Sequence, residues 1–378
     1  MFWTFQDNIR DNVEAMPWRT TVCFLLCIGS MAAEPKARNV ILFLADAGGT
    51  STLHAASVHG YGATRKLFVQ SMPHIGLSDT SSASAWVSDS AAGMTAIVTG
   101  YKTHNGVLSQ GPDAERGKKD GAPLKTILEY AEEHGLSTGV ITNTPVHDAT
   151  PAACYAQAND RRAAAAILKA FLNPRYGDGV DVLIGAGRAA ATKAASEAGF
   201  DFFAEAEKKG YRVIGAAAAV DASARRLVAV FDSGAYDLAA ALRAAIEVLS
   251  RNPKGYFLMV EWDAHTDNPK AGLERVVAFD KAIRETAARV GGKKTLLLFT
   301  ADHSFDLRLI GGRKDAPLNL PANREEGATG KFSVRVNGGH AGEEVLVAAQ
   351  GPGSGRVRGY MDNTDLFGVM MAAFGWKR

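Results

Sequence analysis

Seven acidic or imidazole side chains stand beside apolar runs of this sequence and have the chemistry of metal ligands. These residues are Asp46, Glu261, Asp263, His265, Asp302, His303 and His340. Taken singly, an aspartate behind a strand is most often a helix cap, and a histidine most often lies on the surface. Taken together, so many acids would repel one another unless cations joined them. Oxygen and imidazole donors without thiolates suit catalytic Zn²⁺, with Mg²⁺ at an oxygen-rich neighbouring site.

The stretch 87–96, VSDSAAGMTA, adds a candidate nucleophile. Asp89 or Ser90 is typical of a helix N-cap, which is the plain structural interpretation. A serine at a helix N-terminus also lies where backbone N–H groups attract an anion, and metal ions nearby lower the pKa of its hydroxyl. We therefore interpret Ser90 as a nucleophile. Gly93 leaves room for a substrate phosphate, and it also suits helix packing.

The elements that must position these residues alternate between apolar runs and Ala-rich stretches. Strands are predicted at 39–45, 74–78, 137–142, 180–186, 227–231, 256–261, 295–301 and 344–349, and helices at 126–135, 161–172, 239–250 and 272–290. Continuous apolar strands are buried on both faces, and strand–helix alternation predicts an α/β fold, a three-layer sandwich with a mostly parallel, doubly wound central sheet. Ligands bind at the carboxyl ends of such strands, which is where the candidate residues lie.

Composition narrows the function classes further. The formal net charge is +2 and aromatic residues make up 8% of the chain, so no basic or aromatic surface indicates a nucleic-acid partner. No linker divides the chain, which predicts a single catalytic domain over residues 34–378. The segment 311–332 is expected to be an irregular insertion near the site entrance.

The first 33 residues have the pattern of a leader. Arg19 precedes a short apolar run at 20–28, and the small residues Ser30 and Ala32 follow, as in a secretory signal peptide. The run is too short to span a bilayer. We interpret residues 1–33 as an upstream extension plus signal peptide, with Met16 as the start, and predict a periplasmic or secreted protein. Cys154 would then be the one cysteine kept, because Cys23 and Cys27 lie in the leader.

Five motifs together resemble the metal-dependent alkaline phosphatases, in a short bacterial-type form. They read DSAAGMTA, TGYKTHNGVLS, DATPAA, TADHS and GGHAGEEVLVAAQGP, in the order of the family, and the resemblance runs from Asn39 to Gly353. It implies a phosphomonoesterase that hydrolyses small-molecule phosphate monoesters at alkaline pH through a phosphoserine. It also implies two Zn²⁺ ions and one Mg²⁺ ion, and homodimers are common among such proteins.

The resemblance assigns a role to each candidate. Ser90 would be the nucleophile, and Arg161 would clamp the phosphate, with Arg162 as the alternative. The other roles that it implies concern metals: Asp46, Asp302 and His303 would hold the zinc that activates Ser90, His265 and His340 the second zinc, and Thr150 and Glu261 a magnesium that Asp46 bridges.

Two positions depart from the family pattern. Ala47 stands where the family usually carries glycine, and we expect it to adopt an ordinary φ. The loop that separates the magnesium Glu from a following Asp-x-x-x-His is missing. If the chain stays extended, Glu261, Asp263 and His265 share one face, so that Glu261 reaches magnesium while Asp263 and His265 bind zinc. If it turns helical, Glu261 and His265 pair and Glu261 moves to zinc. We predict the extended arrangement.

Two other functions are compatible with such a fold. A phosphodiesterase or sulfatase of the same superfamily usually offers Thr or a modified Cys as nucleophile, whereas this chain has Ser90. A non-catalytic binding protein would be expected to have lost the nucleophile or several ligands, and none is lost.

Overall fold

The computed structural model of the protein describes residues 36–215 and 222–377. The predicted leader, with Met16, Cys23 and Cys27, lies outside the described residues. Within these ranges, no helix is both long enough and apolar enough to cross a membrane. Cys154 is a buried free thiol.

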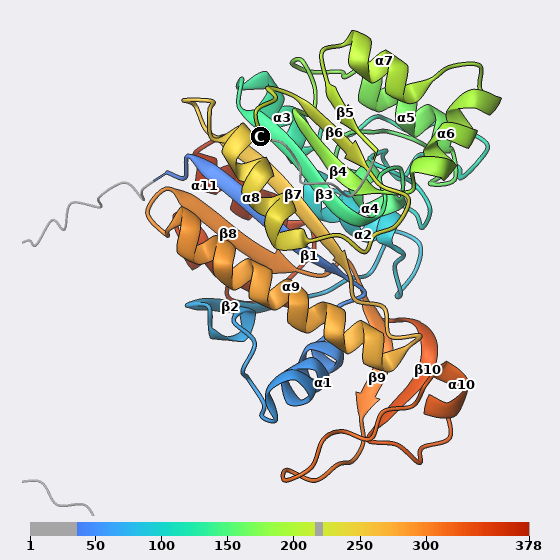
Figure 1. Ribbon diagram of the computed structural model, residues 1–378, viewed down its shortest axis with the longest axis vertical. Helices are drawn as coiled ribbons and strands as arrows, with labels where there is room; N and C mark the ends of the chain where they lie inside the picture. The colour runs from blue at the N-terminus through green and yellow to red at the C-terminus, as the bar shows by residue number, and fades with distance from the viewer. Residues whose placement is uncertain (1–35, 216–221, 378) are drawn as a thin grey trace, which may run out of the picture. The chain divides into compact units, whose positions relative to one another are not determined.

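A large sheet organises the described part of the chain (Figure 1). Its ten strands follow the order β12-β2-β11-β8-β1-β7-β3-β4-β6-β5. Their bounds are β1 Asn39–Asp46, β2 His74–Ser78, β3 Ser137–Pro145, β4 Val182–Ala186, β5 Arg212–Ile214, β6 Leu227–Val230, β7 Tyr256–Asp263, β8 Thr295–Thr300, β11 Val345–Gln350 and β12 Gly359–Met361. The central strand β1 pairs in parallel with β7 and β8, whereas β11 runs antiparallel to β2 and β8. The predicted mostly parallel sheet is confirmed.

Helices cover both faces of this sheet and form two separate cores. The main ones are α1 Thr50–Tyr61, α2 Ser90–Thr99, α3 Ile127–Glu133, α5 Ala164–Leu172, α6 Arg188–Glu197, α7 Phe202–Lys208, α8 Leu238–Leu249, α9 Pro269–Val290 and α11 Asp365–Phe374, with the shorter η1 Val69–Ser71, α4 Ala149–Ala152 and η2 Ser354–Arg356. Alternate residues of β1 enter opposite cores: Leu42 packs with α2 and α11, and Phe43 with α1, α8 and α9. Burial on both faces explains why β1 is continuously apolar.

A second, two-stranded sheet continues from β8. It consists of β9 Ser304–Leu309 and β10 Val334–Ala341, which run antiparallel. The connection between them, predicted as an irregular insertion, contains the short helix α10 Arg324–Gly327. In Figure 1 this orange-to-red part lies beyond the end of the large sheet, beside α1. The sequence analysis did not predict β5, β9, β10 or β12, which are short or lie at a sheet edge.

The turn after β1 corrects one expectation. Ala47 has a φ of 65°, which is the left-handed region, and not the ordinary φ expected from the sequence. The turn is tight, because Gly48 N–H donates to the carbonyl of Ala45 and Gly49 N–H to that of Ala47. The Ala47 N–H points toward Asp302 Oδ1, 3.3 Å away. The conformation therefore carries the chain from β1 to α1 past the end of β8.

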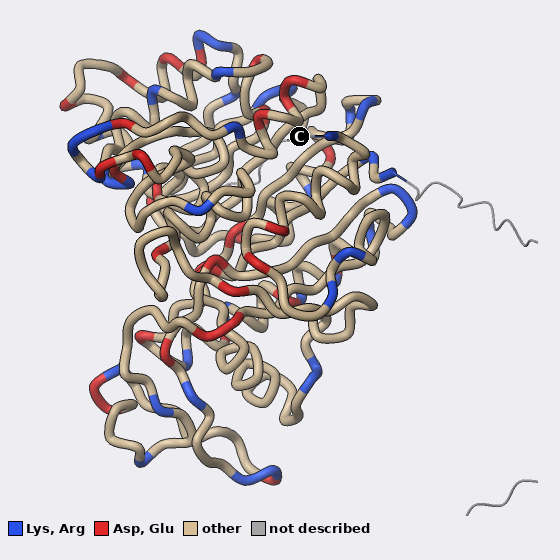
Figure 2. Tube along the Cα trace, turned by 180° about the vertical axis from the view of Figure 1, so that it is seen from behind, with Lys and Arg blue, Asp and Glu red and all other residues tan. Residues whose placement is uncertain are grey.

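Charged residues of both signs are mixed along the chain, as Figure 2 shows. This distribution agrees with the formal net charge of +2. Neither sign of charge is confined to one part of the described chain.

Candidate functional site

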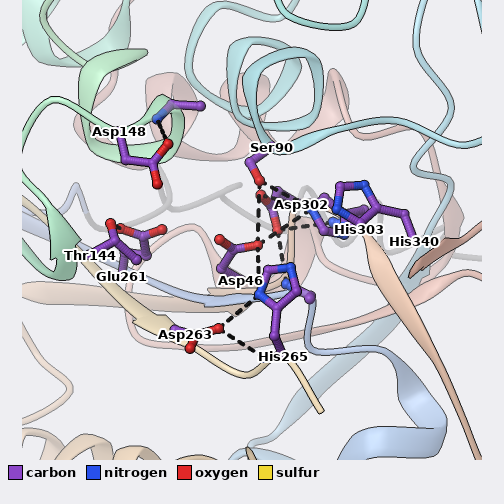
Figure 3. A network of polar contacts seen from close by, with 12 residues as sticks. Asp46, Ser90, Thr144, Asp148, Glu261, Asp263, His265, Asp302, His303 and His340 are labelled. Atoms are coloured by element: carbon purple, nitrogen blue, oxygen red, sulfur yellow. Dashed lines mark hydrogen bonds and ion pairs between the residues drawn. The ribbon is translucent and has the colours of Figure 1, made fainter. Parts of the chain in front are cut away.

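The ends of neighbouring strands bring the predicted residues to one edge of the large sheet. Asp46 is the last residue of β1, and it lies in register with Asp263, the last residue of β7. Asp302 and His303 follow β8 on the other side of β1. Because parallel strands share their carboxyl ends, side chains distant in the sequence meet here (Figure 3).

Two trios of possible metal ligands lie at this edge. The ligand atoms within each trio are all within 4.8 Å of one another: Asp46, Asp302 and His303 form one, and His265, His303 and His340 the other. In the first, His303 Nε2 is 3.4 Å from Asp46 Oδ1 and 3.7 Å from Asp302 Oδ2. In the second, the His303 and His340 rings stack with centroids 3.7 Å apart. The structure thus brings Asp46, Asp302 and His303 together as expected, and it brings His265 and His340 together around His303, whereas Asp263 belongs to neither trio.

The electrostatics of the first trio fit a divalent cation. Burial, together with the charges of Asp302 and Glu261, raises the pKa of Asp46 well above its usual value. Asp302 is fully buried, and its Oδ2 has no hydrogen-bond partner among the described residues. Within the described chain, the ion-pair contacts of these two carboxylates are with histidines alone. Buried carboxylates without Arg or Lys partners are stable when they coordinate metal ions.

On each of the three histidines, Nδ1 lies within hydrogen-bond distance of an oxygen atom. His303 Nδ1 lies 3.1 Å from the carbonyl of the following residue, and His340 Nδ1 2.9 Å from the carbonyl of Ser88. His265 Nδ1 lies 2.8 Å from Asp263 Oδ1. Because these oxygens only accept, Nδ1 carries the proton in each ring and Nε2 keeps its lone pair. This is the usual preparation of a histidine for metal binding.

Burial also sets the charge of His303. Its ring is fully buried, and this burial is the largest cause that lowers its pKa to about 4. The imidazole is therefore neutral at physiological and alkaline pH. A neutral ring is the form that binds a metal ion.

Ser90 lies directly beside the first trio. It is the first residue of α2, after the N-cap Asp89, whose side chain accepts from Ala92 N–H. Its Oγ is 3.1 Å from His303 Nε2 and 3.5 Å from Asp46 Oδ1. Asp89 therefore supplies the cap, and Ser90 faces the cluster from the N-terminus of the helix.

Gly93 allows α2 to reach the cluster. A Cβ atom at this position would collide with the backbone carbonyl of Asp302. The glycine is therefore needed for close packing of the helix against the end of β8, which is the plainer of its two sequence interpretations.

Arg161 contacts Asp89, the residue before the serine, through its side chain, and Arg162 is exposed. The Arg161 guanidinium contacts Asp89 Oδ2 and Asp148 Oδ1, each at 3.1 Å. These two carboxylates hold the side chain across the N-terminus of α2. Arg162 is exposed, and its backbone N–H donates to Asp160. Of the two arginines, Arg161 is therefore the one held beside the N-terminus of α2.

Glu261 occupies a separate, oxygen-rich corner (Figure 3). Hydroxyl groups of Thr142 and Thr144 donate to its Oε2, the latter at 3.1 Å, and Thr150 also hydrogen-bonds its carboxylate. Burial is the largest cause that raises the pKa of Glu261 to about 8, and the charges of Asp148 and Asp302 raise it further. Thr150 and Glu261, predicted as magnesium ligands, are thus adjacent, and the oxygen donors suit that ion.

The compressed motif is extended and not helical. Strand β7 continues through Asp263, and His265 follows without a helical turn. Glu261 therefore lies with the threonines, while Asp263 Oδ1 accepts from both the backbone N–H and Nδ1 of His265. Burial alone would raise the pKa of Asp263, but the hydrogen bond from His265 and the charge of Arg275 outweigh it and hold the pKa below its usual value.

Sequence reasoning missed several supporting residues. Asp89 and Asp148, which hold Arg161, both stand inside quoted motifs, so their position beside Ser90 and Thr150 was a usable signal. Arg275 has no such signal, because it lies on the second turn of α9 in a pattern typical of an ordinary surface helix.

Comparison with known proteins places this geometry in a family. The family described as "Alkaline phosphatase" matches residues 37–219 and 232–317. A streptomycin-6-phosphate phosphatase of Streptomyces griseus is 29% identical over 90% of this chain and 91% of its own length. The alkaline phosphatase of Escherichia coli K12 is 29% identical over 91% of this chain and 88% of its own length.

Solved structures show the same fold. The alkaline phosphatase of the Antarctic bacterium TAB5 superimposes with a TM-score of 0.73 at 24% identity, covering 91% of this chain and all of that one. A mutant of that enzyme was solved with Mg bound in a site called M3. The sequence match over most of the chain and the shared fold show that this protein is a hydrolase of the alkaline phosphatase superfamily and belongs to the alkaline phosphatase family.

Proposed function

We propose that the protein hydrolyses small-molecule phosphate monoesters through a phosphoserine on Ser90. The observation that carries the proposal is the position of Ser90 Oγ, 3.1 Å from His303 Nε2 and beside the buried carboxylates of Asp46 and Asp302. Ser90 also lies at the N-terminus of the ten-residue helix α2, where backbone N–H groups favour an anion. Both features suit a nucleophile that attacks phosphorus.

The residues fit two zinc sites and one magnesium site. Asp46, Asp302 and His303 would hold one zinc, and Asp263, His265 and His340 the other. Thr150 and Glu261 would hold magnesium together with Asp46. When bound, these ions supply Lewis acidity toward the serine hydroxyl and the ester oxygens, and they balance the charge of the carboxylates.

The protein's own groups orient the reaction. Arg161 presents two N–H donors that match two phosphate oxygens, and Asp89 and Asp148 hold its guanidinium in place. The Ser90 oxygen gives up its proton and forms a bond to phosphorus while the bond from phosphorus to the alcohol oxygen breaks, and the alcohol leaves after taking up a proton. Water then cleaves the phosphoserine, which releases phosphate and restores the hydroxyl. We also propose that the enzyme is most active at alkaline pH, as the resemblance to the family implies.

The test combines trapping with a substitution. The wild type, mixed with p-nitrophenyl phosphate and quenched in acid, should carry one phosphate on Ser90 in peptide mass spectrometry. Ser90→Ala should carry none and lose most of its turnover, while keeping its zinc content. If Ser90→Ala keeps the wild-type rate, the proposed mechanism is wrong. If the wild type cleaves only a diester or a sulfate ester, the phosphomonoesterase assignment is wrong.

We also propose that the protein is exported. The support is the leader pattern around residues 20–28 in the sequence. N-terminal sequencing of protein expressed with its full leader should show cleavage shortly after residue 32. An uncleaved chain retained in the cytoplasm would contradict this proposal.

A further inference from the structure

The side chain of Arg275, on α9, forms hydrogen bonds to the turn that follows β7. Its Nε donates to the carbonyl of Asp263 at 2.9 Å, and its Nη2 donates to the carbonyl of His265 at 2.7 Å. The same Nη2 lies 3.1 Å from Asp263 Oδ2. One side chain therefore contacts the backbone on both sides of the turn and one of the carboxylates on it.

Gly272 brings α9 against the same turn. A Cβ atom at this position would lie 2.5 Å from the carbonyl oxygen of His265 and 3.1 Å from Thr266 Cα. Real Cβ atoms essentially never show the first of these contacts, and the second is tighter than most of their contacts. The turn and α9 are therefore in direct backbone contact, one helical turn before Arg275.

The contacts leave Asp263 and His265 little freedom. Asp263 Oδ1 accepts from His265 N–H at 2.9 Å and from Nδ1 at 2.8 Å, while Oδ2 faces Arg275. His265 is thus oriented through Asp263, and Asp263 through Arg275. In metal sites, such outer partners orient the ligand side chains and commonly change metal affinity by about 10–100-fold.

We propose that Arg275 is a positioning residue for the zinc site of Asp263, His265 and His340. The contacts from α9 hold the short turn between Asp263 and His265 in place. The inference rests on the proposed function, because it assigns Arg275 to one of the two zinc sites. Arg275 itself touches neither metal nor substrate.

The test measures zinc binding directly. Wild type, Arg275→Gln and Arg275→Lys are dialysed against buffers of graded free Zn²⁺, and bound zinc per chain is measured by mass spectrometry of the metal. Arg275→Gln should weaken one of the two zinc sites by about 10–100-fold and leave the other unchanged. Arg275→Lys, which can still pair with Asp263, should recover part of the loss. Arg284→Gln, an exposed arginine on the same helix, is the matched control and should bind zinc as the wild type does.

A second variant and a second measurement separate positioning from folding. Gly272→Ala keeps Arg275 but pushes the turn away from α9, so it should weaken the same zinc site. Thermal unfolding of each metal-free variant reports whether the domain still folds. Unchanged zinc affinity in Arg275→Gln would overturn the proposal, and so would a fall in the melting temperature of the metal-free protein with both zinc sites intact. A wild type that binds fewer than two zinc ions would overturn the proposed function and this inference together.

Discussion

At the scale of the residue, His303 links the two halves of the site. Its Nδ1 donates to a backbone carbonyl, and its Nε2 faces Ser90, Asp46 and Asp302. Because burial lowers the pKa of the ring to about 4, the lone pair on Nε2 is available across the whole neutral and alkaline range. The Nε2 atom of this one buried imidazole thus lies beside both the serine hydroxyl and the carboxylates that could bind a cation.

The arginine beside the serine gives a prediction at this scale. Arg161→Ala should lower kcat/KM by a factor equivalent to roughly 2–4 kcal/mol, because a charge-assisted donor pair at the phosphate is lost. Inorganic phosphate should also inhibit the variant more weakly. Arg162→Ala is the control, since that side chain is exposed and should matter far less. Equal losses in the two variants would show that the clamp is assigned to the wrong arginine.

The left-handed Ala47 gives a second prediction. Ala47→Gly should raise the free energy of unfolding by about 1 kcal/mol, because glycine adopts a φ of 65° without a clash of its Cβ. Urea unfolding monitored by circular dichroism measures the change. Ala190→Gly, at an exposed position of α6, should lower the same quantity by up to about 1 kcal/mol. If Ala47→Gly destabilised the protein as Ala190→Gly does, the result would contradict a left-handed conformation at Ala47.

At the scale of the element, strand β7 contributes carboxylates to two different parts of the site. Glu261 and Asp263 lie on the same face of the strand, yet Glu261 contacts threonines from β3 and α4 while Asp263 contacts His265 and Arg275. The strand therefore places its two carboxylates in different surroundings, which we propose to be a magnesium site for Glu261 and a zinc site for Asp263. Its register with β1 keeps Asp46 opposite Asp263.

This division predicts different phenotypes for two conservative substitutions. Asp263→Asn should lose zinc and activity, because the amide is a poorer zinc ligand than the carboxylate and a weaker acceptor for His265. Glu261→Gln should keep both zinc ions and mainly reduce the response of the rate to added Mg²⁺. Metal content per chain and a Mg²⁺ titration of the rate, carried out on both variants, make the comparison. If Glu261→Gln lost a zinc ion while Asp263→Asn kept both, the two roles would have to be exchanged.

At the scale of the whole molecule, a buried acid distant from the site affects stability. Glu132 of α3 accepts hydrogen bonds from Thr138 Oγ1 at 2.6 Å and from Gly179 N–H at 3.0 Å. Burial raises its pKa from 4.5 to about 8. Because the folded pKa is the higher one, the stabilisation is fully present below about pH 4.5 and is lost as the pH rises through about 8. The contribution of Glu132 to stability is therefore lost in the direction of alkaline pH.

Glu132→Gln tests this pH dependence. The amide stays neutral, so the free energy of unfolding should fall less steeply between pH 5 and 8 than in the wild type, by up to ~1.4 kcal/mol per pH unit. Urea unfolding at several pH values measures the slope. Glu197→Gln, at an exposed position of α6, is the matched control. A wild-type slope in Glu132→Gln would show that Glu132 does not hold its proton in the folded protein.

Eight strands of the large sheet, the helices α3, α5, α8 and α9, and the identity of the clustered residues were predictable from the sequence. Runs such as 39–45 and 256–261 are mostly apolar because both faces of the strand are buried. Such burial can therefore be recognised from the composition of the run itself. Asp46, Asp302 and His303 follow such runs, and parallel strands place their ends together whatever the details of packing.

Tertiary structure alone decided how these residues are held. The left-handed φ of Ala47 follows from the approach of β8, which the residues around Ala47 do not encode. Arg275 meets Asp263 because α9 packs across the end of β7, and a residue twelve positions away on a helix carries no sign of that contact in the sequence. The apolar composition of a strand indicates that the strand is buried, and this can be recognised from the strand's own residues. The contacts that hold a site residue in place depend on which elements pack together. Those contacts are determined only when the whole sheet has formed.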